Sequence, residues 1–122
     1  MADQRIVTSR IMKGTQLGEL EELVLLTVAT LYDEAYGVAI MAEIESKANR
    51  KITISTVHAV LKRLEEKGFL DSRYDGATNA RGGRRKHLFT VSTAGQKVLN
   101  LSRAIRNSLW EAIPDLAFNK GS

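Results

Sequence analysis

The sequence of 122 residues predicts a mainly α-helical fold with one small β-hairpin and a long C-terminal helix. Three observations predict this class. Segments before residue 68 repeat apolar residues at helical spacing. Residues 69–74 and 88–91 each alternate and are rich in aromatic and β-branched side chains, which is typical of strands. A last apolar series runs from residue 93 to about residue 116. We expect residues 17–92 to form one domain, residues 93–122 a helix and tail, and residues 1–16 a tail or short helix.

Composition and charge exclude several classes of protein. The chain has no cysteine, so it offers neither a disulfide framework nor a thiolate metal site. No apolar run approaches the roughly 18 to 20 residues that cross a bilayer, and we expect a cytoplasmic protein. The net charge of +4 is uneven: residues 1–50 carry five Lys or Arg against eight Asp or Glu, whereas residues 51–122 carry thirteen against six. Such a regional positive excess favours a polyanionic partner, although a merely solvated surface has the same charge.

The first two helices are predicted from apolar periodicity. Apolar residues cover most of the helix circumference from residue 17 to residue 31, so this helix should be central or shared with a second subunit. Tyr36 and Gly37 open a second helix that should end near Asn49. Its inward positions are predicted to be Val38, Ile40, Met41, Ile44 and Ala48. Residues 52–54 (ITI) then favour a brief strand, and Ser55 is a suitable N-cap for the next helix.

The helix predicted for residues 55–67 has two distinct faces. Val57, Val60, Leu61 and Leu64 cluster on one side, and Gly68 ends the helix. The outward face is small and polar near its start and cationic in its middle, a distribution that suits a recognition helix in the major groove of DNA. An ordinary solvated helix has the same pattern. The outward residues are Ser55, Ala59, Lys62 and Glu66, flanked by Thr56, His58 and Arg63.

The stretch ATNARGGRRKH at residues 77–87 separates the two predicted strands. It is longer than the usual two to five residues of a hairpin loop, and longer loops are often functional. Its cations are Arg81, Arg84, Arg85 and Lys86. A basic hairpin that follows a recognition helix is the wing of a winged helix-turn-helix, and its arginines would meet a DNA backbone or minor groove. A flexible basic loop without a partner is the alternative.

Four segments, in their order and spacing, resemble the PadR-like transcriptional regulators: LGELEELVLL, YGVAIMAEI, ISTVHAVLKRLEEKGFL and RGGRRKHLFTVSTAG. The likeness covers residues 17–95 and implies a winged helix-turn-helix regulator, here expected to be a repressor, with Tyr36 also near DNA. His58 stands where the family usually has Tyr, and Ala59 where it often has Pro. Leu88 and Phe89 replace the usual paired tyrosines, and Ser92 the usual Thr. These departures bear on operator sequence more than on fold.

The terminal segment predicts a dimerisation helix from residue 93 to about residue 116, ended or bent by Pro114. Ser92 or Thr93 can cap its start. Apolar residues spaced by three and four form a seam close to that of a coiled coil, although packing within one chain is an alternative. The seam residues are Val98, Leu101, Ile105, Leu109, Ala112 and Leu116. The resemblance implies a homodimer as well, and two recognition helices related by a two-fold axis predict an imperfectly palindromic DNA site.

The remaining predictions concern effectors and other functions. Trp110 is either an aromatic residue buried by packing or the wall of a pocket for a small aromatic effector between subunits, as the resemblance allows. His58 and His87 have no metal partner at short helical spacing, and no phosphate-binding motif occurs. We therefore expect neither an enzyme nor a cofactor. The competing function is a winged helix that binds another protein or RNA.

Overall fold

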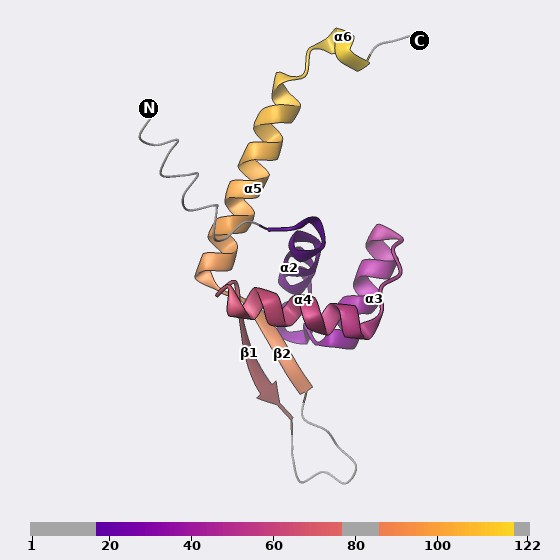
Figure 1. Cartoon of the computed structure of the whole chain (residues 1–122), viewed down its shortest axis with the longest axis vertical. Coiled ribbons are helices and arrows are strands. Elements are labelled where there is room, and N and C mark those ends of the chain that lie inside the picture. Colours follow the sequence, from indigo (N-terminus) through magenta and orange to yellow (C-terminus); the bar gives the residue numbers. More distant parts are fainter. Residues whose placement is uncertain (1–16, 77–85, 119–122) are drawn as a thin grey trace.

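The computed structural model describes residues 17–76 and 86–118. Figure 1 shows a compact group of helices from which the hairpin extends at one end and the C-terminal helix at the other. The elements are α2 (Glu19–Leu31), the 3-10 turn η1 (Tyr32–Glu34), α3 (Gly37–Ala48), α4 (Ile54–Glu66), β1 (Leu70–Asp75), β2 (Lys86–Val91), α5 (Thr93–Ala112) and α6 (Asp115–Phe118). This order confirms the predicted mainly helical class with one hairpin. No helix in the described ranges is both long and apolar enough to span a membrane.

Helix α2 lies at the centre of the core. Val24, Leu25 and Val28 are buried and pack in one cluster with the inward faces of α3 and α4, as the continuous apolar surface of this segment predicted. At its start, the Glu21 carboxylate accepts a hydrogen bond from the Gly18 backbone N–H at 2.7 Å. This carboxylate therefore satisfies one of the amides that a helix N-terminus leaves without an intrahelical partner.

Helix α3 begins at Gly37, after the N-cap Tyr36, and ends at Ala48, in agreement with the predicted end near Asn49. Asn49 follows as the C-cap in the left-handed conformation. Ile40 and Ile44 are buried. The prediction that Val38 and Ala48 point inward is wrong, because both are exposed and Val38 is 58% accessible. Apolar character alone had assigned them to the core. Val38 lies on the opposite side of the helix from the buried Ile40, and Ala48 is the last residue of the helix, beyond the packed turns.

Helix α4 confirms the predicted apolar face, since Val57, Val60, Leu61 and Leu64 are all buried. Its start was predicted wrongly: residues 52–54 form no strand, because Thr53 is the N-cap in place of Ser55 and Ile54 is already the first residue of the helix. The Thr53 hydroxyl accepts a hydrogen bond from the Thr56 N–H at 3.1 Å, and this bond stabilises a helix start in a segment of β-branched residues. The chain leaves α4 through Gly68, whose φ of 82° favours glycine.

The two strands form an antiparallel hairpin in which Leu70 pairs with Val91 and Asp75 with Lys86. Across one face of this hairpin, the rings of Tyr74 and His87 stack with centroids 4.4 Å apart. Register and stacking together define the geometry of the described part of the wing. The prediction placed Lys86 in the loop, whereas it is the first residue of β2.

Helix α5 begins as predicted, with the Ser92 hydroxyl accepting from the Gly95 N–H at 3.0 Å. Gly95 packs against the backbone of Phe69 and leaves no room there for a side chain. The helix ends at Ala112, two residues before Pro114, so the proline ends it rather than bending it. Leu116 consequently lies on the separate helix α6 and does not continue the seam on α5.

Candidate nucleic-acid interface

The outward face of α4 is accessible along its length. Ser55, His58, Ala59 and Lys62 are exposed, and Thr56 is partly exposed. Near the helix start, the Thr53 hydroxyl donates to the Thr56 hydroxyl at 2.9 Å, which fixes the orientation of Thr56. Small side chains near the N-terminus of a helix leave space for the edges of bases, and short hydroxyls can donate to them or accept from them.

His58 packs over the first residue of α3. A methyl group added at Gly37 would lie 2.9 Å from His58 Cε1 and 3.3 Å from Ile54 Cδ1. Only glycine at position 37 therefore lets the imidazole approach the backbone this closely. The contact joins the two helices of the helix-turn-helix and holds His58 beside the start of α3.

The start of α3 also contacts the wing. Tyr36 forms a β-bridge with Leu88, and the Ala35 carbonyl accepts from the Phe89 N–H at 2.9 Å. On the same side, Lys86 Nζ lies 5.0 Å from the centroid of the Tyr36 ring, a cation–π contact. His58, Gly37, Tyr36 and Lys86 thus form a continuous path from α4 to the first residue of β2.

The two cations in the middle of α4 have different surroundings. Within residues 17–76 and 86–118, Lys62 makes no ion pair. Arg63 Nε lies 3.4 Å from Glu21 Oε2, and its side chain is about half exposed. Arg63 is thus directed toward α2, whereas Lys62 remains accessible to an anion.

Three of the predicted wing cations, Arg81, Arg84 and Arg85, lie outside the described residues. The described strands end with the pair Asp75 and Lys86, between which this segment stands in the sequence. The path from α4 to Lys86 accordingly leads to the base of the basic loop. Three elements bring the predicted residues to this part of the molecule. Helix α4 carries Ser55, Thr56, His58, Ala59 and Lys62, the N-cap of α3 is Tyr36, and β2 begins with Lys86.

A sequence model of the transcriptional regulator PadR-like family matches residues 24–101, which include α2 from Val24 onward, α3, α4, both strands and nearly half of α5. The chain belongs to this family. The family's description is that of a transcriptional regulator, in agreement with the resemblance noted in the sequence. No curated protein matches the chain.

Solved structures show the same fold. A PadR family transcriptional regulator from Eggerthella lenta is 25% identical, with a TM-score of 0.60 over 98% of this chain and 99% of that one. A PadR family regulator from Clostridium difficile is 22% identical, with a TM-score of 0.64 over 77% of this chain and 93% of that one. Bacillus subtilis PadR, solved with operator DNA, is 18% identical, with a TM-score of 0.57 over 66% of this chain and 44% of that one.

In this PadR-like chain, α5 exposes much of its predicted seam. Val98 is 7% exposed and belongs to the chain's own core, and Leu101 is half-buried. Beyond them Ile105 is 45% exposed and Leu109 65% exposed. Ala112, at the end of the helix, is exposed as well. Among the described residues, nothing covers this apolar surface along the outer half of α5.

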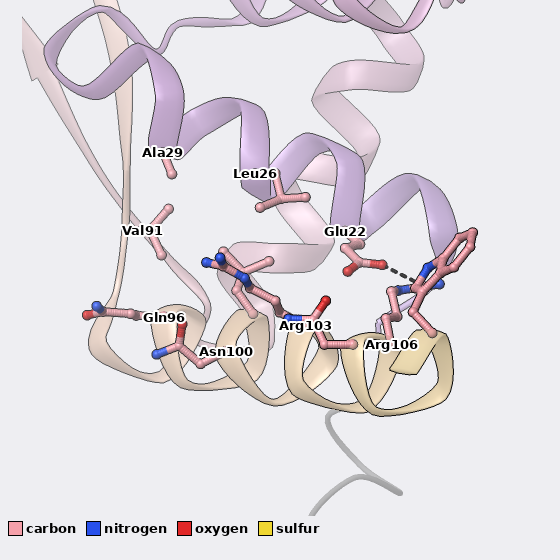
Figure 2. Close-up of a pocket in the computed structure, with 11 residues that line it drawn as sticks. Glu22, Leu26, Ala29, Val91, Gln96, Asn100, Arg103 and Arg106 are labelled. Carbon is pink, nitrogen blue, oxygen red and sulfur yellow. Dashed lines mark hydrogen bonds and ion pairs between the residues drawn. The ribbon is translucent and has the colours of Figure 1, made fainter. Parts of the chain in front are cut away.

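Trp110 is 66% exposed, so it is not buried by packing within the chain. Its ring meets Phe118 of α6 edge to face, with centroids 6.4 Å apart. It also lines a groove of about 540 Å³ between α2 and α5, together with Leu26, Leu99 and Arg103. Figure 2 shows the groove, with the Glu22–Arg106 contact joining α2 to α5.

Sequence reasoning missed the residues that hold the interface in place. Gly37 was noticed as a helix start, but its role in seating His58 depends on a residue 21 positions later. Glu21 and Glu22 were noticed only as part of a matching segment, and their partners follow 42 to 84 residues later. The available signal was the unusual density of acids in residues 19–22, which favours a helix N-terminus without naming a partner.

Proposed function

We propose that the protein is a sequence-specific DNA-binding transcriptional repressor that acts as a homodimer on an imperfect palindrome. The outward face of α4 would enter the major groove, with Ser55, Thr56, His58 and Ala59 meeting base edges. Ala59 would at most touch a thymine methyl group. In each subunit the wing would lie along the adjacent backbone or minor groove.

The observation that carries this proposal is the continuous path from α4 to the wing. His58 packs on Gly37, and the neighbouring Tyr36 lies under Lys86 at the base of the basic loop. The recognition helix α4 and the described part of the wing therefore lie on one surface, as the binding of both to one duplex requires. A similar fold, that of Bacillus subtilis PadR, is known in complex with operator DNA.

Phosphate contacts would come from the cations of this surface. Lys62 and Lys86 are exposed, and Arg81, Arg84 and Arg85 belong to the loop between the strands. We expect Arg63 to contribute less, because its guanidinium is directed toward Glu21. With three or four contacts per subunit, log K for operator binding should fall against log salt concentration with a slope of roughly −5 to −7.

The homodimer is supported by the exposed apolar surface of α5. Ile105 and Leu109 are large exposed side chains on one long helix, and Leu26 of α2 is also 45% exposed. Burying such a surface against a second copy removes apolar area from water at about 25 cal/mol per Å². Two chains joined in this way would present two α4 helices to successive major grooves, roughly 34 Å apart.

An effector would bind in the groove beside Trp110. The groove combines apolar walls with the cations of Arg103 and Arg106, which suits a small aromatic molecule that carries a polar or acidic group. Its binding would release the repressor from DNA. Quenching of the single tryptophan by a panel of phenolic and other aromatic compounds tests this part, and an unchanged spectrum with every compound would remove it.

The DNA-binding proposal is tested by selecting duplexes from fragments of the source genome and then measuring competition at about 150 mM salt. A regulator should prefer its selected duplex to non-specific DNA by roughly 10³ or more. Equal competition by unrelated duplexes would contradict the proposal. Stronger competition by single-stranded RNA would instead favour the RNA-binding alternative.

A further inference from the structure

Three glutamates at the start of α2 each hold a different part of the molecule. Glu19 binds the segment after α3, Glu21 binds the end of α4, and Glu22 binds α5. The partners are Arg50 for Glu19, Lys67 and Arg63 for Glu21, and Ser102 and Arg106 for Glu22. Neighbouring residues on one helical turn therefore connect the recognition helix and the C-terminal helix to the same piece of backbone.

The contact made by Glu21 is buried. Its side chain is 9% exposed, and both carboxylate oxygens lie 2.9 Å from Lys67 Nζ, directly after α4. Burial alone would raise the pKa of Glu21, but the hydrogen bonds from the Gly18 N–H and from Lys67 lower it below its usual range. The carboxylate is therefore charged near neutral pH and is fully engaged by donors. A charged contact of low exposure holds its geometry more firmly than one in water.

Glu22 makes the corresponding contact with α5. It accepts from the Ser102 hydroxyl at 2.8 Å and from Arg106 at 2.9 Å, and its side chain is 17% exposed. The Arg106 contact lies on the wall of the groove that Trp110 also lines, whereas Ser102 lines a neighbouring hollow with Leu109. A displacement of α5 would thus act on Glu22, the residue next to the one that holds α4.

Glu19 provides an internal comparison. It accepts from Arg50 at 2.7 and 2.8 Å, but its side chain is 71% exposed. Exposed ion pairs contribute little, because water screens them and both side chains lose freedom when they pair. The three glutamates therefore share charge and helical turn, while only Glu21 and Glu22 make contacts of low exposure to the elements that matter for DNA binding.

We propose that Glu21 is a positioning residue for the recognition helix. By fixing the end of α4 on the turn of α2 that also anchors α5 through Glu22, it sets the angle between α4 and α5. In a homodimer joined through α5, that angle determines the separation of the two α4 helices and hence the half-site spacing that the protein accepts. The inference rests on the proposed function, and it names Glu21 as the residue through which the geometry of the dimer sets the half-site spacing.

The first experiment measures the angle in the free protein. The chain has no cysteine, so spin labels can be placed at Glu66→Cys on α4 and Glu111→Cys near the far end of α5, both exposed positions. Labelled chains are diluted with unlabelled ones, and pulsed double electron–electron resonance gives the distance between labels within one chain. Glu21→Gln should broaden or shift the distance distribution, whereas Glu19→Gln, which changes the net charge equally, should leave it unchanged.

The second experiment measures the functional consequence. The selected operator is prepared with its half-sites at the original spacing and at spacings one base pair longer and shorter. Glu21→Gln should reduce the discrimination between these duplexes by about fivefold or more. A loss of stability alone would lower the active fraction on all three duplexes equally and would leave their ratio unchanged. Glu19→Gln should discriminate as the wild type does.

The outcomes separate this inference from the function on which it rests. If the wild type selects no duplex, the proposed function fails, and the distance measurement still tests Glu21. If the wild type selects a duplex but Glu21→Gln keeps both the distance distribution and the spacing ratio, the inference is overturned. If circular dichroism shows that Glu21→Gln does not fold, Lys67→Gln takes its place, with the same supporting and contradicting results.

Discussion

Replacing Gly37 by alanine tests whether the packing of His58 against Gly37 controls DNA recognition. The new Cβ would lie 2.9 Å from His58 Cε1 and 3.2 Å from Nε2, so the imidazole must retreat by at least about 0.5 Å to reach ordinary contact distance. Because His58 is exposed, its side chain can tilt by about 30° from its rotamer at a cost of about 0.5–1.5 kcal/mol. Alanine favours a helix over glycine by up to about 1 kcal/mol, so the free energy of unfolding should change little.

The effect on DNA should be larger than the effect on stability. A base contact is worth about 1 kcal/mol or more, so Gly37→Ala should weaken binding to the selected operator by roughly fivefold. Thermal melting gives the stability, and fluorescence anisotropy gives the affinity for operator and for unrelated duplex. The decisive control is His58→Ala, alone and combined with Gly37→Ala. If Gly37→Ala weakens binding as much in the absence of the imidazole as in its presence, the contact is not the reason.

Four further changes have definite expected outcomes. Gly95→Ala should lower the free energy of unfolding by about 3 kcal/mol, measured by denaturant titration, because its Cβ would overlap the backbone at the start of β1. Leu109→Glu should give a folded monomer in sedimentation, since this side chain is 65% exposed within one chain; an intact dimer would refute the α5 interface. Arg84→Ala combined with Arg85→Ala should weaken binding to all duplexes alike, and it should reduce the magnitude of the slope of log K against log salt concentration by about 3 to 4. Folding lowers the pKa of Glu21 from its ordinary value of 4.5, so its charged contacts stabilise the fold above that pH and are lost as the pH falls through the lowered pKa. Glu21→Gln should therefore lower the free energy of unfolding at pH 7, and this difference from the wild type should shrink below about pH 4.5.

Local periodicity was sufficient to predict most of the fold. Val57, Val60, Leu61 and Leu64 mark the buried face of α4 by spacing alone, and the structure buries all four. The start of the same helix was not predictable from propensity, because residues 52–54 alternate as a strand does. The Thr53 hydroxyl decides the outcome by bonding to the Thr56 N–H. A single local hydrogen bond thus overrides the strand preference of a short segment.

The candidate interface was predicted in composition but not in architecture. The exposed positions Ser55, His58, Ala59 and Lys62 follow from the helical period. Their relation to the wing does not, because it depends on an imidazole meeting a glycine of another helix. Arg63 shows the same limit: its position on the outward side was predicted from the helical period, but its approach to Glu21 depends on how α4 packs against α2. Contacts between distant segments are set by tertiary packing, which a one-dimensional pattern does not contain.

Hydroxyl-radical footprinting of the selected operator tests the central claim most directly, because it reports where two copies of α4 and the wing meet one duplex. The account predicts protected patches on each strand that are related by the two-fold axis of the palindrome, with centres about 10 base pairs apart. A single protected patch without symmetry, or uniform protection along every duplex tested, would contradict it.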